Sequence, residues 1–198
     1  MRQVRILIWI LVVLALAGFA FLYLRTPQTE RGPQLTINPA SFGGPFTLVG
    51  ADGKPFPSSR LAGRPYAIFF GFTHCPDVCP TTLQRLVKLR DELSRGDDAF
   101  NIVFITVDPE RDGPKEVGRY ANEFEAPIIG LTGQPAQIER VKQLYGIFAQ
   151  KVPDQSGGYS VDHTATAMLF GRDGQFFATI SPQEPDGSAL DKLKRVTA

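Results

Sequence analysis

Cysteine and histidine are scarce in this 198-residue chain, which holds two residues of each type. So few cysteines exclude a small scaffold held together by several disulfides. Lysine and arginine total 21 against 20 aspartate and glutamate residues, so the chain lacks the excess of basic charge that is typical of nucleic-acid binding. Glycine and proline are too few for a low-complexity or collagen-like protein. Any metal or nucleophile chemistry therefore depends on very few residues, and their positions are informative.

Charge is absent from residues 6–24, which have the sequence ILIWILVVLALAGFAFLYL. At a rise of about 1.5 Å per residue, this segment nearly spans a hydrocarbon core of roughly 30 Å. We therefore expect a leader at 1–5, a transmembrane anchor at 6–24 and a linker at 25–45 that is rich in Pro, Gly, Ser and Thr. A cleavable signal peptide is the alternative, because Ala15-Leu16-Ala17 resembles a small-x-small cleavage site.

The short leader also predicts the orientation of the anchor. A segment of this length cannot carry a domain and commonly stays in the cytoplasm, so we expect the following domain on the outer side of the membrane. An Arg- and Ser-rich amphipathic presequence does not precede the anchor, which disfavours import into an organelle. The expected location is the inner (cytoplasmic) membrane of a bacterium, crossed once, with the soluble domain on the periplasmic side.

Apolar patterning over residues 46–198 predicts an α/β domain. Buried strands are expected at 66–72, 101–107 and 127–131, and hairpins at 46–56 and 165–180. Helices are expected from about Pro80, at 114–124, at 135–148 with Ile138, Val141, Leu144, Tyr145 and Phe148 on one face, and after a Ser188 cap. Strand–helix–strand units favour parallel pairing, and the closing hairpin adds antiparallel strands. The expected fold is a mixed sheet flanked by helices, with an N-terminal hairpin.

Both cysteines lie in the segment GFTHCPDVCP at residues 71–80, between a buried strand and its following helix. Open α/β sheets bind ligands at the carboxyl ends of such strands. Cys75 and Cys79 are four positions apart, so on a helix they would share a face, with Cβ atoms roughly 5–6 Å apart. That separation suits two thiolates on one metal at about 2.3 Å each, or a disulfide after modest adjustment. Two buried structural cysteines are the alternative.

The histidines and the acidic segment are less specific signals. His163 precedes the closing hairpin, where a histidine is more often an ordinary polar residue than a ligand, and spacing does not show that its loop reaches the cysteines. His74 is adjacent to Cys75, and we expect it to shape the loop or tune the thiols rather than bind a metal. The segment DPERD at 108–112 is interpreted as a charged turn with Arg111 between carboxylates, in preference to an acid/base cluster.

Three segments together carry a resemblance to a known family. They are GFTHCPDVCP at 71–80, ITVDPERD at 105–112 and DHTATAMLF at 162–170. In this order behind a single anchor, over about residues 40–195, they resemble the Sco/SenC family. Its members are membrane-anchored, thioredoxin-like proteins that help assemble the dinuclear copper centre of cytochrome c oxidase.

The resemblance implies a thioredoxin-like domain with copper bound by Cys75, Cys79 and His163. By the same resemblance, Asp77 is assigned a role in the loop and Asp162 a role in orienting the histidine, both as hypotheses. Independently of the family, two soft thiolates and one imidazole suit Cu(I). Three ligands also leave the ion accessible to an incoming ligand from a partner.

Two functions remain open at the level of sequence. The leading hypothesis is a copper chaperone rather than an enzyme. It would deliver copper to the copper-bearing subunit of cytochrome c oxidase and receive it from another copper chaperone, as Cu(I) or Cu(II). The alternative is a thiol–disulfide reductase acting on the cysteines of the oxidase copper site, with Cys75 and Cys79 as its redox pair and no need of His163. A peroxidase and a non-catalytic interaction domain are more distant alternatives.

Overall fold

The computed structural model describes residues 42–154 and 157–198, together with the isolated helical positions Gln3, Trp9, Leu16, Gly18 and Phe21. Apart from these positions, the expected leader, anchor and most of the linker lie outside the described residues. Within the described part of the chain, no helix has both the length and the apolar character needed to cross a membrane. The chain divides into two units, Met1–Ile37 and Asn38–Ala198, and the second contains the sheet and helices that follow.

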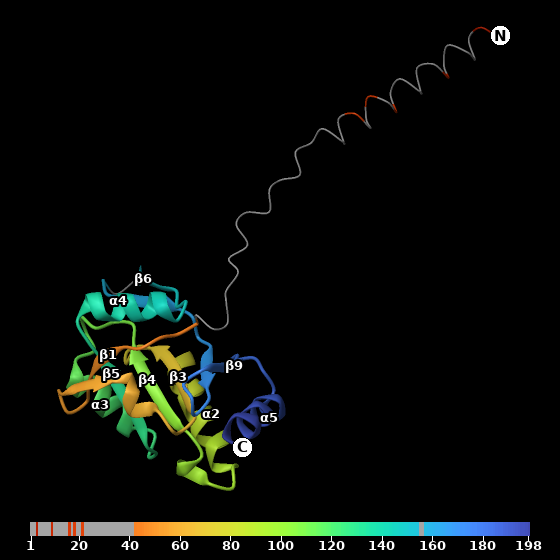
Figure 1. Ribbon diagram of the computed structural model, residues 1–198. Coiled ribbons are helices and arrows are strands. Elements are labelled where there is room, and N and C mark those ends of the chain that lie inside the picture. Colours follow the sequence, from red (N-terminus) through yellow and green to blue (C-terminus); the bar gives the residue numbers. More distant parts are fainter. Residues whose placement is uncertain are drawn as a thin grey trace. The chain divides into compact units, whose positions relative to one another are not determined.

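A seven-stranded mixed sheet forms the centre of this unit (Figure 1), with strand order β2-β1-β5-β4-β3-β8-β9. The strands are β1 (Thr47–Gly50), β2 (Pro55–Pro57), β3 (Tyr66–Gly71), β4 (Asn101–Thr106), β5 (Ile128–Thr132), β8 (Ala167–Phe170) and β9 (Phe176–Ile180). Strand β4 is parallel to β3 and β5, whereas β1, β2, β8 and β9 pair antiparallel with their neighbours. The predicted mixed sheet and both hairpins are therefore confirmed, as the thioredoxin-like resemblance implies.

Helices cover both faces of the sheet, which explains why its central strands are apolar throughout. The helices are α2 (Val78–Asp91), α3 (Pro114–Asn122), α4 (Pro135–Leu144) and α5 (Asp186–Thr197), with short 3-10 turns at Ser58–Leu61 and Gly96–Asp98. Right-handed crossovers from β3 to β4 and from β4 to β5 place α2 and α3 on one face, and α5 packs against α2. Helix α4 lies on the other side (Figure 1). Every residue of β3 is consequently buried.

The region after α4 differs from the prediction. The helix ends at Leu144 rather than Phe148, because Gly146 adopts a left-handed backbone conformation (φ 61°) that ends the helix. Phe148 therefore leaves the expected apolar face and is 59% exposed. Strands β6 (Ala149–Pro153) and β7 (Tyr159–His163) follow and pair only with each other within the described chain. Sequence analysis missed this hairpin because its residues alternate poorly between apolar and polar.

Of the four predicted helix starts, those at Pro114 and Pro135 are confirmed, the one near Pro80 is refined and the one at Ser188 is wrong. Helix α5 begins at Asp186 after Pro185, so Ser188 is inside its first turn and donates a hydrogen bond to Glu184 instead of capping the helix. Helix α2 begins at Val78, two residues before Pro80. This earlier start places Cys79 within the first helical turn.

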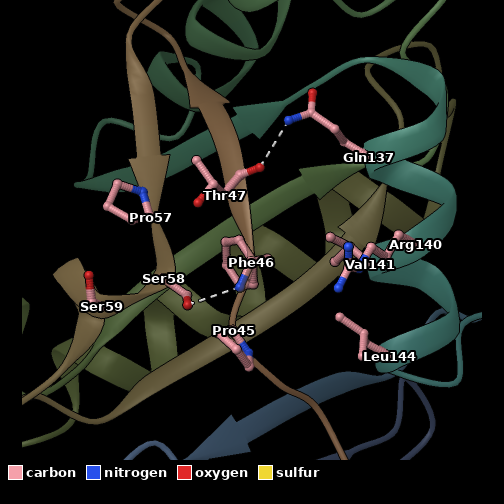
Figure 2. A pocket seen from close by; sticks show the side chains of 10 residues that line it. All are labelled: Pro45, Phe46, Thr47, Pro57, Ser58, Ser59, Gln137, Arg140, Val141 and Leu144. Atoms are coloured by element: carbon pink, nitrogen blue, oxygen red, sulfur yellow. Dashed lines mark hydrogen bonds between the residues drawn. The ribbon is translucent and has the colours of Figure 1, made fainter.

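A hollow of about 430 Å³ lies between the first hairpin and α4 (Figure 2). Gln137 of α4 donates a hydrogen bond to the Thr47 carbonyl (3.2 Å), and the Phe46 amide donates to the Ser58 hydroxyl (3.1 Å). Neither a cysteine nor a histidine lines this hollow. It is therefore separate from the cysteine and histidine residues considered next.

Candidate metal site

Strand pairing brings two distant segments to the same end of the sheet. Tyr66 of β3 pairs with Phe170 of β8, and Ile68 pairs with Met168, in antiparallel register. The start of β8 therefore lies beside the end of β3. Because the cysteine loop follows the end of β3 and His163 shortly precedes β8, the pairing brings the histidine to the cysteines.

Cys75, Cys79 and His163 form one group, in which the three ligand atoms all lie within 4.8 Å of one another. The Cys79 Sγ is 3.3 Å from the His163 Nε2, and the Cys79 amide donates a hydrogen bond to the Cys75 Sγ (3.4 Å). Neither cysteine forms a disulfide. The structure thus unites all three residues that the resemblance named, including the histidine that spacing alone did not place.

The two thiols differ in accessibility. Cys79 is fully buried in the first turn of α2, whereas Cys75 precedes the helix and is half-buried. Gly71 makes room for the inner thiol, because a Cβ atom there would lie 2.8 Å from the Cys79 Sγ and 3.0 Å from the Phe104 ring. Cys79 is therefore held in place, and Cys75 is the more exposed of the two residues.

The His163 ring is oriented by its backbone and by two aromatic rings. Its Nδ1 is 3.0 Å from the Thr164 carbonyl. A carbonyl only accepts hydrogen bonds, so in the neutral ring Nδ1 carries the proton and Nε2 presents its lone pair to the cysteines. Phe69 and Phe72 pack edge-on against the imidazole, at 6.1 and 5.8 Å between centroids. The carbonyl takes the orienting role assigned to Asp162, whose side chain is exposed.

His74 and Asp77 lie in the loop but outside the group of three. The His74 side chain is 54% exposed, and its Nδ1 is 3.1 Å from the Thr73 hydroxyl and 3.5 Å from the Asp112 carboxylate. Asp77 precedes α2 and accepts a hydrogen bond from the Thr81 hydroxyl (3.4 Å). Both positions fit the predicted roles in shaping the loop.

The acidic segment after β4 is a charged turn in which Arg111 pairs with Asp108, as predicted, but its two aspartates are not at the surface. Asp108 and Asp112 are both fully buried. The Asp112 carboxylate accepts hydrogen bonds from the Thr73 amide (2.9 Å), the Thr73 hydroxyl (2.6 Å) and the Thr106 hydroxyl (2.6 Å). It therefore anchors the start of the cysteine loop. A signal was present in the sequence, because these acids lie within six residues of the end of a buried strand, where a carboxylate can meet several donors.

A shared hydrogen bond gives the two thiols opposite pKa shifts. The hydrogen bond from Cys79 is the main cause that lowers the pKa of Cys75 to about 4, against the effect of burial and with help from the amides of Asp77 and Cys79. The same hydrogen bond, together with burial, raises the pKa of Cys79. The reduced site therefore holds one thiolate, on Cys75, and one thiol.

Alkylation of the reduced protein at pH 7 should distinguish the two sulfurs. We expect iodoacetamide to modify Cys75 at least about tenfold faster than Cys79, because Cys75 is an accessible thiolate and Cys79 a buried thiol. The Cys75 rate should stay flat from pH 6 to 8 and fall only as the pH approaches 4. Mass spectrometry of quenched digests measures both rates. A Cys75 rate that climbs steeply between pH 7 and 8.5 would contradict the lowered pKa.

Comparison with known proteins gives consistent matches. The model of the SCO1/SenC family matches residues 34–198. The Arabidopsis thaliana mitochondrial SCO1 homolog 1 is 38% identical over 141 residues, which cover 71% of this chain and 42% of that protein. The SCO2-like protein of Rickettsia conorii is 35% identical over 187 residues, covering 88% of this chain and 91% of that protein. The chain thus spans less than half of the plant relative and most of the bacterial one.

A solved structure agrees in fold. Bradyrhizobium japonicum ScoI, determined with copper bound, is 42% identical and superposes with a TM-score of 0.70. The match covers 78% of this chain and 99% of that one.

Proposed function

Because this chain belongs to the SCO1/SenC family, we propose that it binds one copper ion through Cys75, Cys79 and His163 and delivers it during assembly of the dinuclear copper centre of cytochrome c oxidase. The observation that carries this proposal is the convergence of two thiols and one imidazole to within 4.8 Å, from positions 84 residues apart. Copper in the related ScoI structure supports the choice of metal. The copper-bearing oxidase subunit is the proposed recipient, and another copper chaperone the proposed donor.

The donor atoms fit copper by type and spacing. Thiolates are soft ligands that select Cu(I), whereas a structural zinc site usually has four protein ligands. In a trigonal site with bonds of about 2.0–2.3 Å, ligand atoms lie roughly 4 Å apart. The observed separations within 4.8 Å therefore need only small side-chain adjustments. Nε2 of His163 is already free to coordinate, because Nδ1 faces the Thr164 carbonyl.

Transfer of the ion requires that a partner reach it. Cys75 is half-buried, and the neighbouring His74, Pro76 and Asp77 are exposed. Ligand exchange can therefore begin at Cys75 while Cys79 and His163 still hold the ion. This asymmetry suits release to a partner's thiol or imidazole better than permanent storage.

Anaerobic Cu(I) loading of the reduced full chain in detergent tests the proposal. We expect one Cu(I) per chain, and His163→Ala should bind Cu(I) at least about tenfold more weakly in competition with a chromogenic chelator, because it removes a ligand. His74→Ala is the matched control and should keep the parent affinity, since its ring faces Thr73 and Asp112. Equal affinities in His163→Ala and the parent would refute the three-ligand site.

A thiol–disulfide reductase is the second candidate, and the lowered pKa of Cys75 favours it. An accessible thiolate four residues from a buried thiol has the arrangement of an attacking and a resolving cysteine. This activity does not require His163. Reduction of a disulfide peptide that is preserved in His163→Ala, with no Cu(I) retained by the parent, would favour the reductase over the chaperone.

We also propose that residues 6–24 anchor the protein in the bacterial inner membrane. The leader (1–5) would then face the cytoplasm, and the linker (25–45) would connect to the thioredoxin-like copper-binding domain (46–198) in the periplasm. The support is the uncharged apolar run with a short leader. Alkaline extraction should leave the full chain in the membrane fraction, and a periplasm-dependent phosphatase fused after Ala198 should be active. Release of a shortened chain would instead indicate a cleaved signal peptide.

A further inference from the structure

His163 lies on a hairpin that is separate from the main sheet. Strands β6 and β7 form their own two-stranded sheet, in which Ala149 pairs with His163 and Pro153 with Tyr159. A two-stranded hairpin is at best marginally stable by itself in water. The position of the imidazole relative to the cysteines therefore depends on contacts between this hairpin and the rest of the domain.

The acidic segment after β4 supplies such contacts at the start of β7. Nη1 of Arg111 donates a hydrogen bond to the Tyr159 carbonyl (2.9 Å), and the guanidinium carbon lies 3.8 Å from the centre of the Tyr159 ring. The Tyr159 hydroxyl donates to the buried Asp108 carboxylate (2.9 Å). Asp108 also forms an ion pair with Nε of Arg111. Arg111, Asp108 and Tyr159 therefore each contact the other two, and Tyr159 is four residues before His163.

Arg111 also reaches the aromatic contact of the imidazole. Its guanidinium carbon lies 5.8 Å from the centre of the Phe72 ring. Phe72 in turn packs edge-on against His163, nearly perpendicular to it. Arg111 thus contacts both the strand that carries the histidine and a ring against which the histidine packs.

We propose that Arg111, held by Asp108, is a positioning residue that sets His163 relative to Cys75 and Cys79 and thereby sets the copper affinity. This inference rests on the proposed function, and it assigns no contact between Arg111 and the metal. Arginine is specifically suited to the position, because one planar group donates two separate hydrogen bonds and stacks on an aromatic ring. Nη2 of Arg111 is buried and has no hydrogen-bond acceptor among the described residues. The guanidinium group therefore does not use all of its donors.

A double-mutant cycle on Cu(I) affinity tests this role in the full chain. Arg111→Met should weaken binding by about tenfold, within the 10–100-fold range for groups that orient a metal ligand. In the His163→Ala background, the same substitution should change the affinity by less than about twofold, because residues that act through one another are non-additive. Equal losses in both backgrounds, or no loss in the parent, would overturn the proposal.

Arg85→Met is the matched control for general destabilisation. Arg85 is also a largely buried arginine, which bonds Asp186 (2.7 Å) and the Ser181 carbonyl (3.0 Å) to join α2 to the α5 region. It should lower the urea midpoint about as much as Arg111→Met does but leave the Cu(I) affinity within about twofold of the parent. Should Arg111→Met fail to fold, Arg111→Lys replaces it in the cycle, with a smaller expected loss because lysine keeps the charge without the planar fork.

Hydrogen exchange provides a readout that does not need copper. In metal-free Arg111→Met, amides of β6 and β7 should exchange at least about tenfold faster than in the parent, while those of β3 and β4 stay protected. If the parent binds no Cu(I), the proposed function fails, and exchange alone decides whether Arg111 positions the hairpin. Unchanged exchange in β7 would overturn the positioning role in either case.

Discussion

Cys79→Ala is expected to lower the Cu(I) affinity by more than about 100-fold, beyond the usual effect of losing a group that only orients a ligand. Cys79 is the buried sulfur, 3.3 Å from Nε2 of His163 and beneath Gly71. Without it, the remaining Cys75 and His163 belong to separate elements and offer only two ligands. Chelator competition under anaerobic conditions measures the change.

Cys75→Ala should lose Cu(I) affinity to a similar degree but for a different reason. It removes the thiolate of the reduced site, so the Cys79 thiol, whose pKa is still raised by burial, must give up its proton for Cu(I) to bind. The affinity that remains in Cys75→Ala should therefore increase with pH between 7 and 9. A pH-independent residual affinity would contradict the need for Cys79 to lose a proton on binding Cu(I).

In both cysteine variants, weaker binding caused by loss of a ligand must be distinguished from weaker binding caused by a less stable fold. Thr81→Ala is a suitable control, because Thr81 lies in the same helical turn, is exposed, and donates a hydrogen bond to the exposed Asp77 carboxylate. Each cysteine variant should unfold within about 1–2 kcal/mol of the parent, as is usual for single substitutions. Cu(I) binding by Cys79→Ala at the parent affinity would exclude Cys79 as a ligand, and loss of binding in Thr81→Ala would show that the loop as a whole had been disturbed.

The sequence predicted the cysteine part of the site better than the histidine part. Cys75 and Cys79 are local to one strand–helix junction, and hydrophobic patterning identifies both the strand and the helix. His163 is close to them only because β8 is antiparallel to β3 and adjacent to it. Strand order is a property of the whole sheet, so only the family resemblance named this residue in advance.

The incorrect predictions share a physical cause. Helix α4 was extended to Phe148 because its apolar spacing continues past Gly146, whose left-handed conformation is decided by the turn. Hairpin β6–β7 went unpredicted because its residues gain stability from Tyr159, Asp108 and Arg111 rather than from alternating burial. Contacts between distant segments therefore decided the outcome where local patterning was ambiguous.

Asp112→Ala is expected to lower the free energy of unfolding by about 3–5 kcal/mol, at the high end for a single substitution, because three hydrogen bonds lose their acceptor. The carboxylate is fully buried and accepts three hydrogen bonds, two from Thr73 and one from Thr106. Alanine leaves these donors without their acceptor, and each unsatisfied buried donor costs about 1–3 kcal/mol. Asp112→Asn should cost less, because the amide retains one accepting oxygen. Urea unfolding of the reduced, metal-free full chain in detergent measures both changes.

Asp112→Ala should also change the exposure of the cysteines, an effect that an ordinary substitution in the core would not have. Thr73 is two residues before Cys75, so releasing Thr73 loosens the loop and exposes Cys79 to alkylation more often. Asp98→Ala is the matched control: Asp98 is exposed and pairs with Arg64 on the surface, where ion pairs contribute about 1 kcal/mol or less. A loss below about 1 kcal/mol in Asp112→Ala, or an unchanged Cys79 alkylation rate, would show that the loop keeps its conformation without this carboxylate. If the free energy of unfolding falls and Cys79 is alkylated faster, Asp112 both stabilises the fold and holds the copper ligands in position.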